Sequence, residues 1–200
     1  MKSFIGLSII LFFSFSVEAE TYRILFQKGA VKFLRAGKIV SPPAMTGDLI
    51  KVPEGGLVVL RSQHQTLKLM GDTVITPLED PQEGTVIELI RGAIVSQVTG
   101  KYKVKTRFTG FGVRGTQFFV QSNPEGDAWM CVQEGVVNVR KDDQSVDVPA
   151  GKGVFVDSLS ISTPQFYAWT KDINWKMTSE EGELDQKLHI EYDLLENFYD

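Results

Sequence analysis

Short apolar runs separated by glycine, proline, asparagine or aspartate extend from Tyr22 to Val156, and this pattern most constrains the fold. The runs either alternate apolar with polar residues or are apolar throughout, and none keeps a 3.6-residue apolar period for three turns. Both patterns favour β-strands over helices. Breaks that recur every roughly 10 to 20 residues are typical of a sandwich, barrel or rolled solenoid. Strands are expected at Tyr22–Phe26, Leu57–Leu60, Thr66–Met70, Thr85–Ile90, Ala128–Val132 and Val136–Val139.

Two segments, Glu88–Val95 and Val132–Val139, share the order strand, charged residue, glycine, strand. Stacked β-arches that each turn a corner on a glycine would produce such copies. We therefore expect an all-β fold, built as a β-roll or solenoid-like sandwich of short strands.

Residues 163–200 differ in character from the β-rich segment. Residues 163–175 are rich in aromatic side chains and are expected to wrap the core. Thr178-Ser-Glu-Glu181 is typical of a capping box, and an apolar stripe follows it, so we expect a C-terminal amphipathic α-helix. Residues 179–200 hold eight acidic residues and one basic residue, whereas residues 20–178 carry a net charge of +3. A mildly basic body is therefore followed by an acidic tail.

Residues 1–19 form a candidate signal peptide. Lys2 precedes an apolar run from Phe4 to Phe13, and Val17 and Ala19 are small residues placed as a signal peptidase requires. The run is shorter than the about 20 apolar residues that a spanning helix needs, although an uncleaved anchor is the alternative. Cleavage would leave a periplasmic or secreted chain without a membrane span. Its expected parts are a β domain at residues 20–162, and an aromatic linker with the acidic helix at residues 163–200.

A glycine-punctuated motif, Gly112-Val-Arg-Gly-Thr116, leads into an apolar strand. Gly110, Gly112 and Gly115 lie within six residues, which is typical of a tight turn or of a close approach to another segment. The other elements, in chain order, are a Gly-Asp pair within Met45–Ile50, a strand-Gly-strand at Ile87–Ile94, the corner Glu134-Gly135, and Ala150-Gly-Lys-Gly153. Together with the motif they resemble the FecR domain family over about residues 45–156.

This resemblance implies a β-rich periplasmic module, best known from regulators that relay iron-siderophore signals across the inner membrane. Those regulators join a cytoplasmic anti-sigma segment to the module through a membrane helix, whereas here a candidate signal peptide leads directly into strands. We therefore expect that this chain does not relay a signal across a membrane alone. The motif residues implied by the resemblance are Gly112, Val113, Arg114, Gly115, Thr116, Glu134, Gly135, Gly151 and Gly153.

Arg114 has two interpretations. Its planar guanidinium could bind a carboxylate or phosphate of a partner. Alternatively, it could bond turn carbonyls or pair with an acid such as Glu134, and so fix one glycine corner to another. The motif is embedded between strand-forming residues, which favours the structural role.

Four cations, Lys101, Lys103, Lys105 and Arg107, alternate with Tyr102, Val104, Thr106 and Phe108. In a strand, the cations would share one face at spacings of about 6 to 7 Å. Three interpretations are open: a solvated face that protects a sheet edge, a surface for an anionic partner, or a dock for the chain's own acidic helix.

The chain offers few residues for catalysis or metal binding. His64 and His189 are the only histidines and lie in different segments, and the single cysteine, Cys131, falls in an apolar run typical of a buried thiol. We predict no enzyme activity, no catalytic residues, no metal and no cofactor. A net charge of −4 on an exported chain also argues against nucleic acid as a partner.

The leading hypothesis is a soluble, exported FecR-like module that binds another envelope protein, as a protein-interaction or signalling-accessory domain. The alternative is binding of an envelope polymer, either peptidoglycan or an anionic glycan. That binding would use exposed aromatic side chains within Phe166–Trp175 or the basic row Lys101–Arg107.

Overall fold

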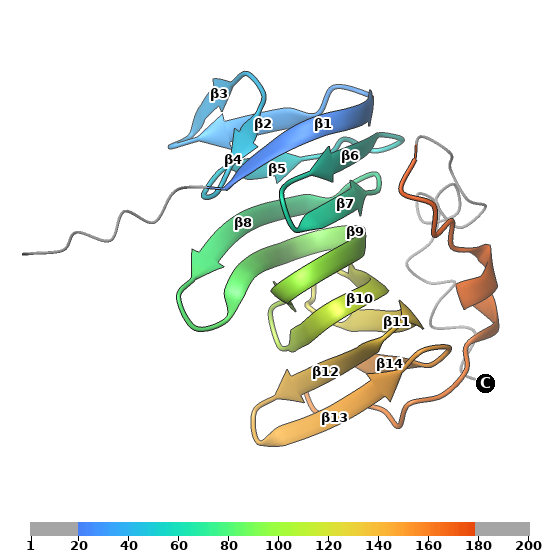
Figure 1. The fold of residues 1–200 in the computed structure, drawn as a ribbon. Helices are drawn as coiled ribbons and strands as arrows, with labels where there is room; N and C mark the ends of the chain where they lie inside the picture. Colours follow the sequence, from blue (N-terminus) through green and yellow to red (C-terminus); the bar gives the residue numbers. More distant parts are fainter. Residues whose placement is uncertain (1–19, 179–200) are drawn as a thin grey trace, which may run out of the picture.

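The computed structural model describes residues 20–178, and their backbone is almost entirely β-strand (Figure 1). Every strand pairing in this range is antiparallel. The all-β prediction is confirmed, and each of the six expected runs coincides with a strand or part of one, except that Met70 lies one residue beyond the end of its strand. The expected acidic helix lies outside the described residues.

Fourteen strands and one short 3₁₀ helix make up this part of the chain. Their bounds are β1 Thr21–Lys28, β2 Lys32–Arg35, β3 Lys38–Val40, β4 Ala44–Met45, β5 Leu49–Lys51, β6 Leu57–Arg61, β7 Gln65–Leu69, β8 Val74–Asp80, β9 Gly84–Lys105, β10 Gly110–Ser122, β11 Ala128–Glu134, β12 Val136–Lys141, β13 Gln144–Pro149, β14 Gly153–Val156 and η1 Ala168–Asp172.

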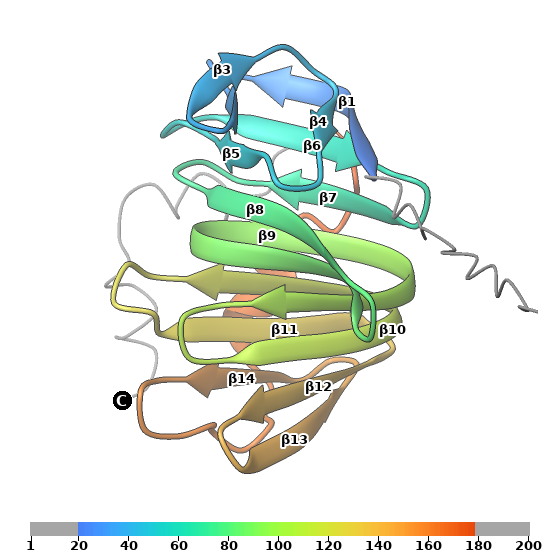
Figure 2. The same cartoon turned by 90° about the vertical axis from the view of Figure 1, so that its left-hand side faces the viewer.

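The strands form one continuous sheet that rolls up along the molecule. Strands β1 to β6 lie at one end, β12 to β14 lie at the other, and the long strand β9 curls around the middle (Figures 1 and 2). Strand β9 pairs in turn with β8, β7 and β10, and β10 pairs with both β11 and β12. The expected β-roll is therefore built around two long bent strands.

The inside of the roll is a single apolar core. Alternate residues of the strands point into it, including Leu60, Leu67, Ile94, Phe118 and Val139, all fully buried. Tyr102 meets Phe118 there in an edge-to-face contact with ring centroids 6.0 Å apart. Burial of this core supplies the main driving force for rolling the sheet.

A second apolar cluster lies on the outer face of one wall of the roll. Here the residues between the core positions are buried too: Val95 beside Ile94, Phe119 beside Phe118, and Cys131 beside Met130. Strand β11 is accordingly buried at five consecutive positions. This explains why some expected strands are apolar throughout, because their two faces are both covered.

The segment after β14 covers this outer face (Figure 1). Tyr167, Trp169 and Ile173 are buried against it, and Trp169 contacts Phe119 edge-to-face at 5.9 Å between centroids. The prediction that residues 163–175 wrap the core is confirmed, and so is the burial of Cys131, where desolvation raises the pKa of the thiol. Phe166 alone among the aromatic residues of this segment is strongly exposed, at 65%.

The Gly-Asp pair near the start of the resemblance is a structural clamp. The carboxylate of Asp48, fully buried, accepts hydrogen bonds from Arg35 Nε at 2.7 Å, from Arg35 Nη2 at 2.9 Å and from the backbone N–H of Met45 at 2.8 Å. The bonds from Arg35 lower the pKa of Asp48, although burial opposes them. Arg35 belongs to β2, so this clamp joins the first hairpin to the turn before β5.

Replacing Trp169 with alanine should destabilise the fold by about 3–5 kcal/mol, since a buried aromatic ring is lost from the outer cluster. Urea unfolding of the purified chain measures the change. Phe166→Ala is the matched control and should have almost no effect, because that ring is mostly exposed. Equal losses in the two variants would contradict the packing of Trp169 in the outer cluster.

Asp48→Asn should destabilise the chain near neutral pH and much less in acid. Because folding lowers the pKa of Asp48, the carboxylate contributes stability above its unfolded pKa, about 3.9, and that contribution is lost as pH falls through the folded pKa. Unfolding free energies of wild type and variant, measured from neutrality to successively lower pH, should converge as the pH falls through the lowered pKa of folded Asp48. A gap independent of pH would contradict the clamp.

Candidate functional site

The motif Gly112–Thr116 lies where the roll turns a corner. Strand β10 leaves its partner β12 after Val113 and joins β11 from Gln117 onward, so β11 and β12 meet at Gly135 beside the motif. The register between β9 and β10 also shifts between Arg114 and Thr116, which marks a β-bulge. Val113 before the bulge and Phe118 after it both face the core, so the shift keeps the apolar residues inside.

Gly115 and Gly135 need their glycine identity at this corner. Both have positive φ, +65° and +87° respectively. A Cβ on Gly135 would lie 3.0 Å from the carbonyl oxygen of Gly115 and 3.1 Å from Thr116 Oγ1. The two glycines therefore let adjacent strands turn in close contact. Gly92, in the other copy of the strand-Gly-strand pattern, also has positive φ, as expected for a second corner.

The other implied motif residues occupy two further places. Gly151 has positive φ in the turn before β14, where its N–H donates to the Val132 carbonyl at 2.8 Å. Gly153 pairs with Cys131, and a Cβ there would lie 2.6 Å from the Met130 carbonyl oxygen. Glu134 is exposed next to the Gly135 corner.

Arg114 points to solvent. It is exposed, and its side chain makes no hydrogen bond or ion pair among residues 20–178. The expected pairing with Glu134 is absent in this range. Its Cα lies opposite that of Lys101 on β9, so it joins a basic surface.

The basic row follows the predicted alternation along β9. Lys101 and Lys105 are exposed and Lys103 is partly exposed, while Tyr102 and Val104 are buried in the core. Arg107 lies beyond the end of the strand, where its guanidinium sits 5.3 Å from the Phe108 ring centroid and donates to the Glu125 carbonyl at 3.4 Å. Three of the four predicted cations therefore share one strand face, and Arg107 belongs to the following turn.

A groove of about 640 Å³ runs beside this row. Its floor is the outer face of β10, where Gly110 and Gly112 carry no side chains. In the register, Gly112 lies between Lys103 and Asn138, and Gly110 lies between Lys105 and Arg140. We call this the basic groove; its polar lining is Glu83, Lys101, Lys103, Arg114, Asn138 and Arg140.

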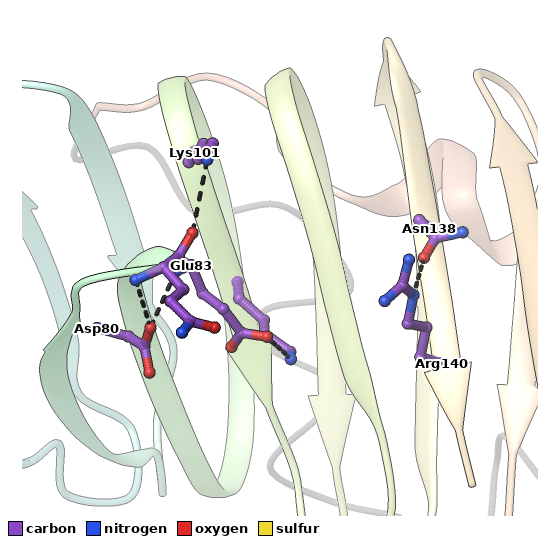
Figure 3. A network of polar contacts seen from close by, with 7 residues as sticks. Asp80, Glu83, Lys101, Asn138 and Arg140 are labelled. Atoms are coloured by element: carbon purple, nitrogen blue, oxygen red, sulfur yellow. Dashed lines mark hydrogen bonds and ion pairs between the residues drawn. The ribbon is translucent and has the colours of Figure 1, made fainter. Parts of the chain in front are cut away.

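Polar contacts order both sides of the basic groove. On one side, Lys103 Nζ pairs with Glu83 Oε1 at 2.7 Å, and Lys101 Nζ donates to the Gln82 carbonyl at 3.5 Å. On the other side, Arg140 Nε donates to Asn138 Oδ1 at 2.8 Å. Figure 3 shows Lys101 and Glu83 separated from Asn138 and Arg140 by a strand without drawn side chains. The arrangement can bind an anionic group between two strands.

A second hollow, of about 520 Å³, lies on the other side of the motif. Gly115, Thr116 and Glu134 line it together with His64 and Gln65 from the β6–β7 hairpin region. Gln65 Nε2 donates to the Tyr22 hydroxyl at 2.9 Å, while its buried Oε1 has no hydrogen-bond partner among residues 20–178. The lining is mainly amides and hydroxyls, and it carries fewer cations than the basic groove.

The described part of the chain offers neither a metal centre nor a helix that could span a membrane. Within residues 20–178, no group of three or more His, Cys, Asp or Glu side chains is placed to hold a metal ion. No helix there has the length and apolarity needed to cross a membrane.

Sequence reasoning located the row on β9 but missed Glu83, Asn138 and Arg140. These residues are distant in sequence from Lys103, and only strand register brings them to one groove. The glycines of the motif also divide into two roles, because Gly112 forms the groove floor whereas Gly115 and Gly135 form the corner.

Alanine at these three glycines should destabilise the chain in the order Gly135, Gly115, Gly112. Gly135→Ala adds a steric contact to an unfavourable φ, Gly115→Ala adds only the φ strain of about 1–2 kcal/mol, and Gly112→Ala adds neither, since its nearest neighbour would be 3.8 Å away. Urea unfolding measures the series. A loss at Gly112 as large as that at Gly135 would contradict this division of roles.

Comparisons with known proteins give the family of this region. The model of the FecR protein family matches residues 48–138, which contain the corner, the basic row and most of the groove. None of the curated proteins compared matches the chain. Two crystal structures of a "putative anti-sigma factor" from Parabacteroides distasonis ATCC 8503 share its fold, each with a TM-score of 0.54 and 20% identity. The matched region covers 60% of this chain and 61% of theirs, so the chain spans about three fifths of their length. The resemblance seen in the sequence is confirmed over this range, because residues 48–138 match the FecR family model.

Proposed function

We propose that this chain is an exported, non-enzymatic signalling-accessory module that binds a partner protein of the cell envelope. The FecR domain at residues 48–138 is the observation that carries the proposal. The solved structures of the same fold are described as a "putative anti-sigma factor", and this supports a signalling role. Export is inferred from the signal-peptide pattern of residues 1–19.

The basic groove is the surface we assign to the partner. The outer face of the opposite wall is already covered by residues 163–177, which bury Tyr167 and Trp169. The groove wall has no such cover among the residues that the structure describes, and it exposes Arg114 and Val136. A partner can therefore reach it without unfolding any described segment.

Binding of an anionic envelope polymer is the second candidate, and the cations of the basic groove favour it. The aromatic route to polymer binding has less support, because Tyr167 and Trp169 pack inward. Only Phe166 of that segment offers a largely exposed ring. The basic groove is therefore the proposed binding surface in both candidate functions.

Site-specific photo-crosslinking in cells tests the partner. A photo-reactive amino acid at Val136, which is 50% exposed on the groove rim, should capture one envelope protein reproducibly. The same amino acid at Leu159, which is 82% exposed and lies outside the groove, is the matched control and should not capture it. Adding Arg114→Ala should reduce the Val136 product. Identical products at both positions, or none at either, would refute the proposal.

A further inference from the structure

Glu83 occupies the basic groove as a ligand would. It comes from the turn between β8 and β9, and its carboxylate lies 2.7 Å from Lys103 Nζ. Lys103 in turn extends over the glycine floor, since a Cβ on Gly110 would lie only 2.5 Å from Lys103 Cε. One carboxylate of the chain itself therefore neutralises the most enclosed cation of the groove.

The turn that carries Glu83 is held firmly, while its side chain is not. Asp80 Oδ1 accepts the backbone N–H groups of Gln82 at 2.8 Å and Glu83 at 2.9 Å, which fixes the turn, and these bonds lower the pKa of Asp80. The Glu83 side chain is 42% exposed, and among residues 20–178 it pairs only with Lys103. Partly exposed ion pairs of this kind contribute little to stability. A competing anion can therefore replace Glu83 at a small cost in free energy.

Other cations of the groove are available to such an anion. Arg114 has no polar partner among residues 20–178, and Arg140 uses only its Nε, toward Asn138. Among the described residues, the acid that lines the groove is Glu83. Asp80 at the end of β8 holds the turn that carries it, and Asp147 on β13 accepts from Asn138 Nδ2 at 2.6 Å. The cations Lys101, Lys103, Arg114 and Arg140 outnumber them.

The spacing suits an extended chain with carboxylates at alternate residues. Lys101 and Lys103 are two residues apart on one strand face, a separation of about 6.6 Å, which is also the repeat of same-side residues in an extended peptide. Arg114 lies across from Lys101, and its guanidinium can hold a carboxylate in a bidentate manner. The glycine floor provides room for a backbone to lie along the groove.

We propose that Glu83 is an internal stand-in for the ligand, and that an extended acidic segment of the partner protein displaces it from Lys103. This rests on the proposed function for the identity of the partner. The groove is thus partly closed by the chain's own carboxylate, and removing that carboxylate opens it.

Binding of a fluorescent octapeptide of alternating Glu and Ser to the full mature chain, followed by anisotropy at low salt, tests this. Glu83→Gln should tighten binding about threefold, while Arg114→Ala should weaken it at least about tenfold. Gly112→Val, which fills the floor without a positive-φ penalty, should abolish binding while circular dichroism and thermal unfolding stay near wild type. High salt should weaken all binding.

Glu88→Gln is the matched control, because it removes one exposed acid of β9 outside the groove. Equal tightening by Glu83→Gln and Glu88→Gln would overturn the stand-in role, since net charge alone would then explain it. Undiminished binding by Gly112→Val and by Arg114→Ala would place the peptide elsewhere. A carboxylated glycan that binds where the peptide does not would overturn the peptide ligand.

Crosslinking at Val136 reports on the proposed function separately, because a partner without an acidic segment would still be captured there.

Discussion

The close backbone contact between Gly115 and Gly135 at the corner of the roll is the constraint on which the rest of the structure depends. A long antiparallel sheet can bury one apolar core only if its strands bend together, and adjacent strands must then approach at the bend. Gly115 and Gly135 meet this need, because a Cβ on Gly135 would touch the Gly115 carbonyl. The register shift beside Gly115 keeps Val113 and Phe118 on the inside face. The family motif is thus primarily a corner of the roll.

The corner also decides where the chain can bind something. One wall of the roll has both faces covered, with Phe119, Trp129 and Trp169 packed outside it. On the other wall, the outer side of β10 consists of Gly110, Gly112 and Arg114, so the surface sinks between two polar strands. The same short motif therefore produces a rigid bend on one side and a cationic groove floor on the other.

Much of this organisation was predictable from local pattern. Alternating and fully apolar runs located the strands, and the fully apolar ones are now explained by burial on two faces, as in β11. Alternation also placed Lys101, Lys103 and Lys105 on one face of β9, because side-chain direction in a strand follows from sequence parity. The alternation did not predict the position of Arg107 correctly. The strand ends at Lys105, and side chains no longer alternate between two faces in the turn that follows.

The sequence by itself determined the class of fold, the resemblance to the FecR family, the glycine corner and the basic row, since each depends on residues that are neighbours in the chain. The tertiary structure decided that Arg140 and Asn138 face Lys103 across Gly112, that Glu83 pairs with Lys103, and that Arg114 is exposed. These relations depend on which strands pair and in what register. Strand pairing and register are determined by burial of the whole core. They therefore cannot be deduced from the residues of any one segment.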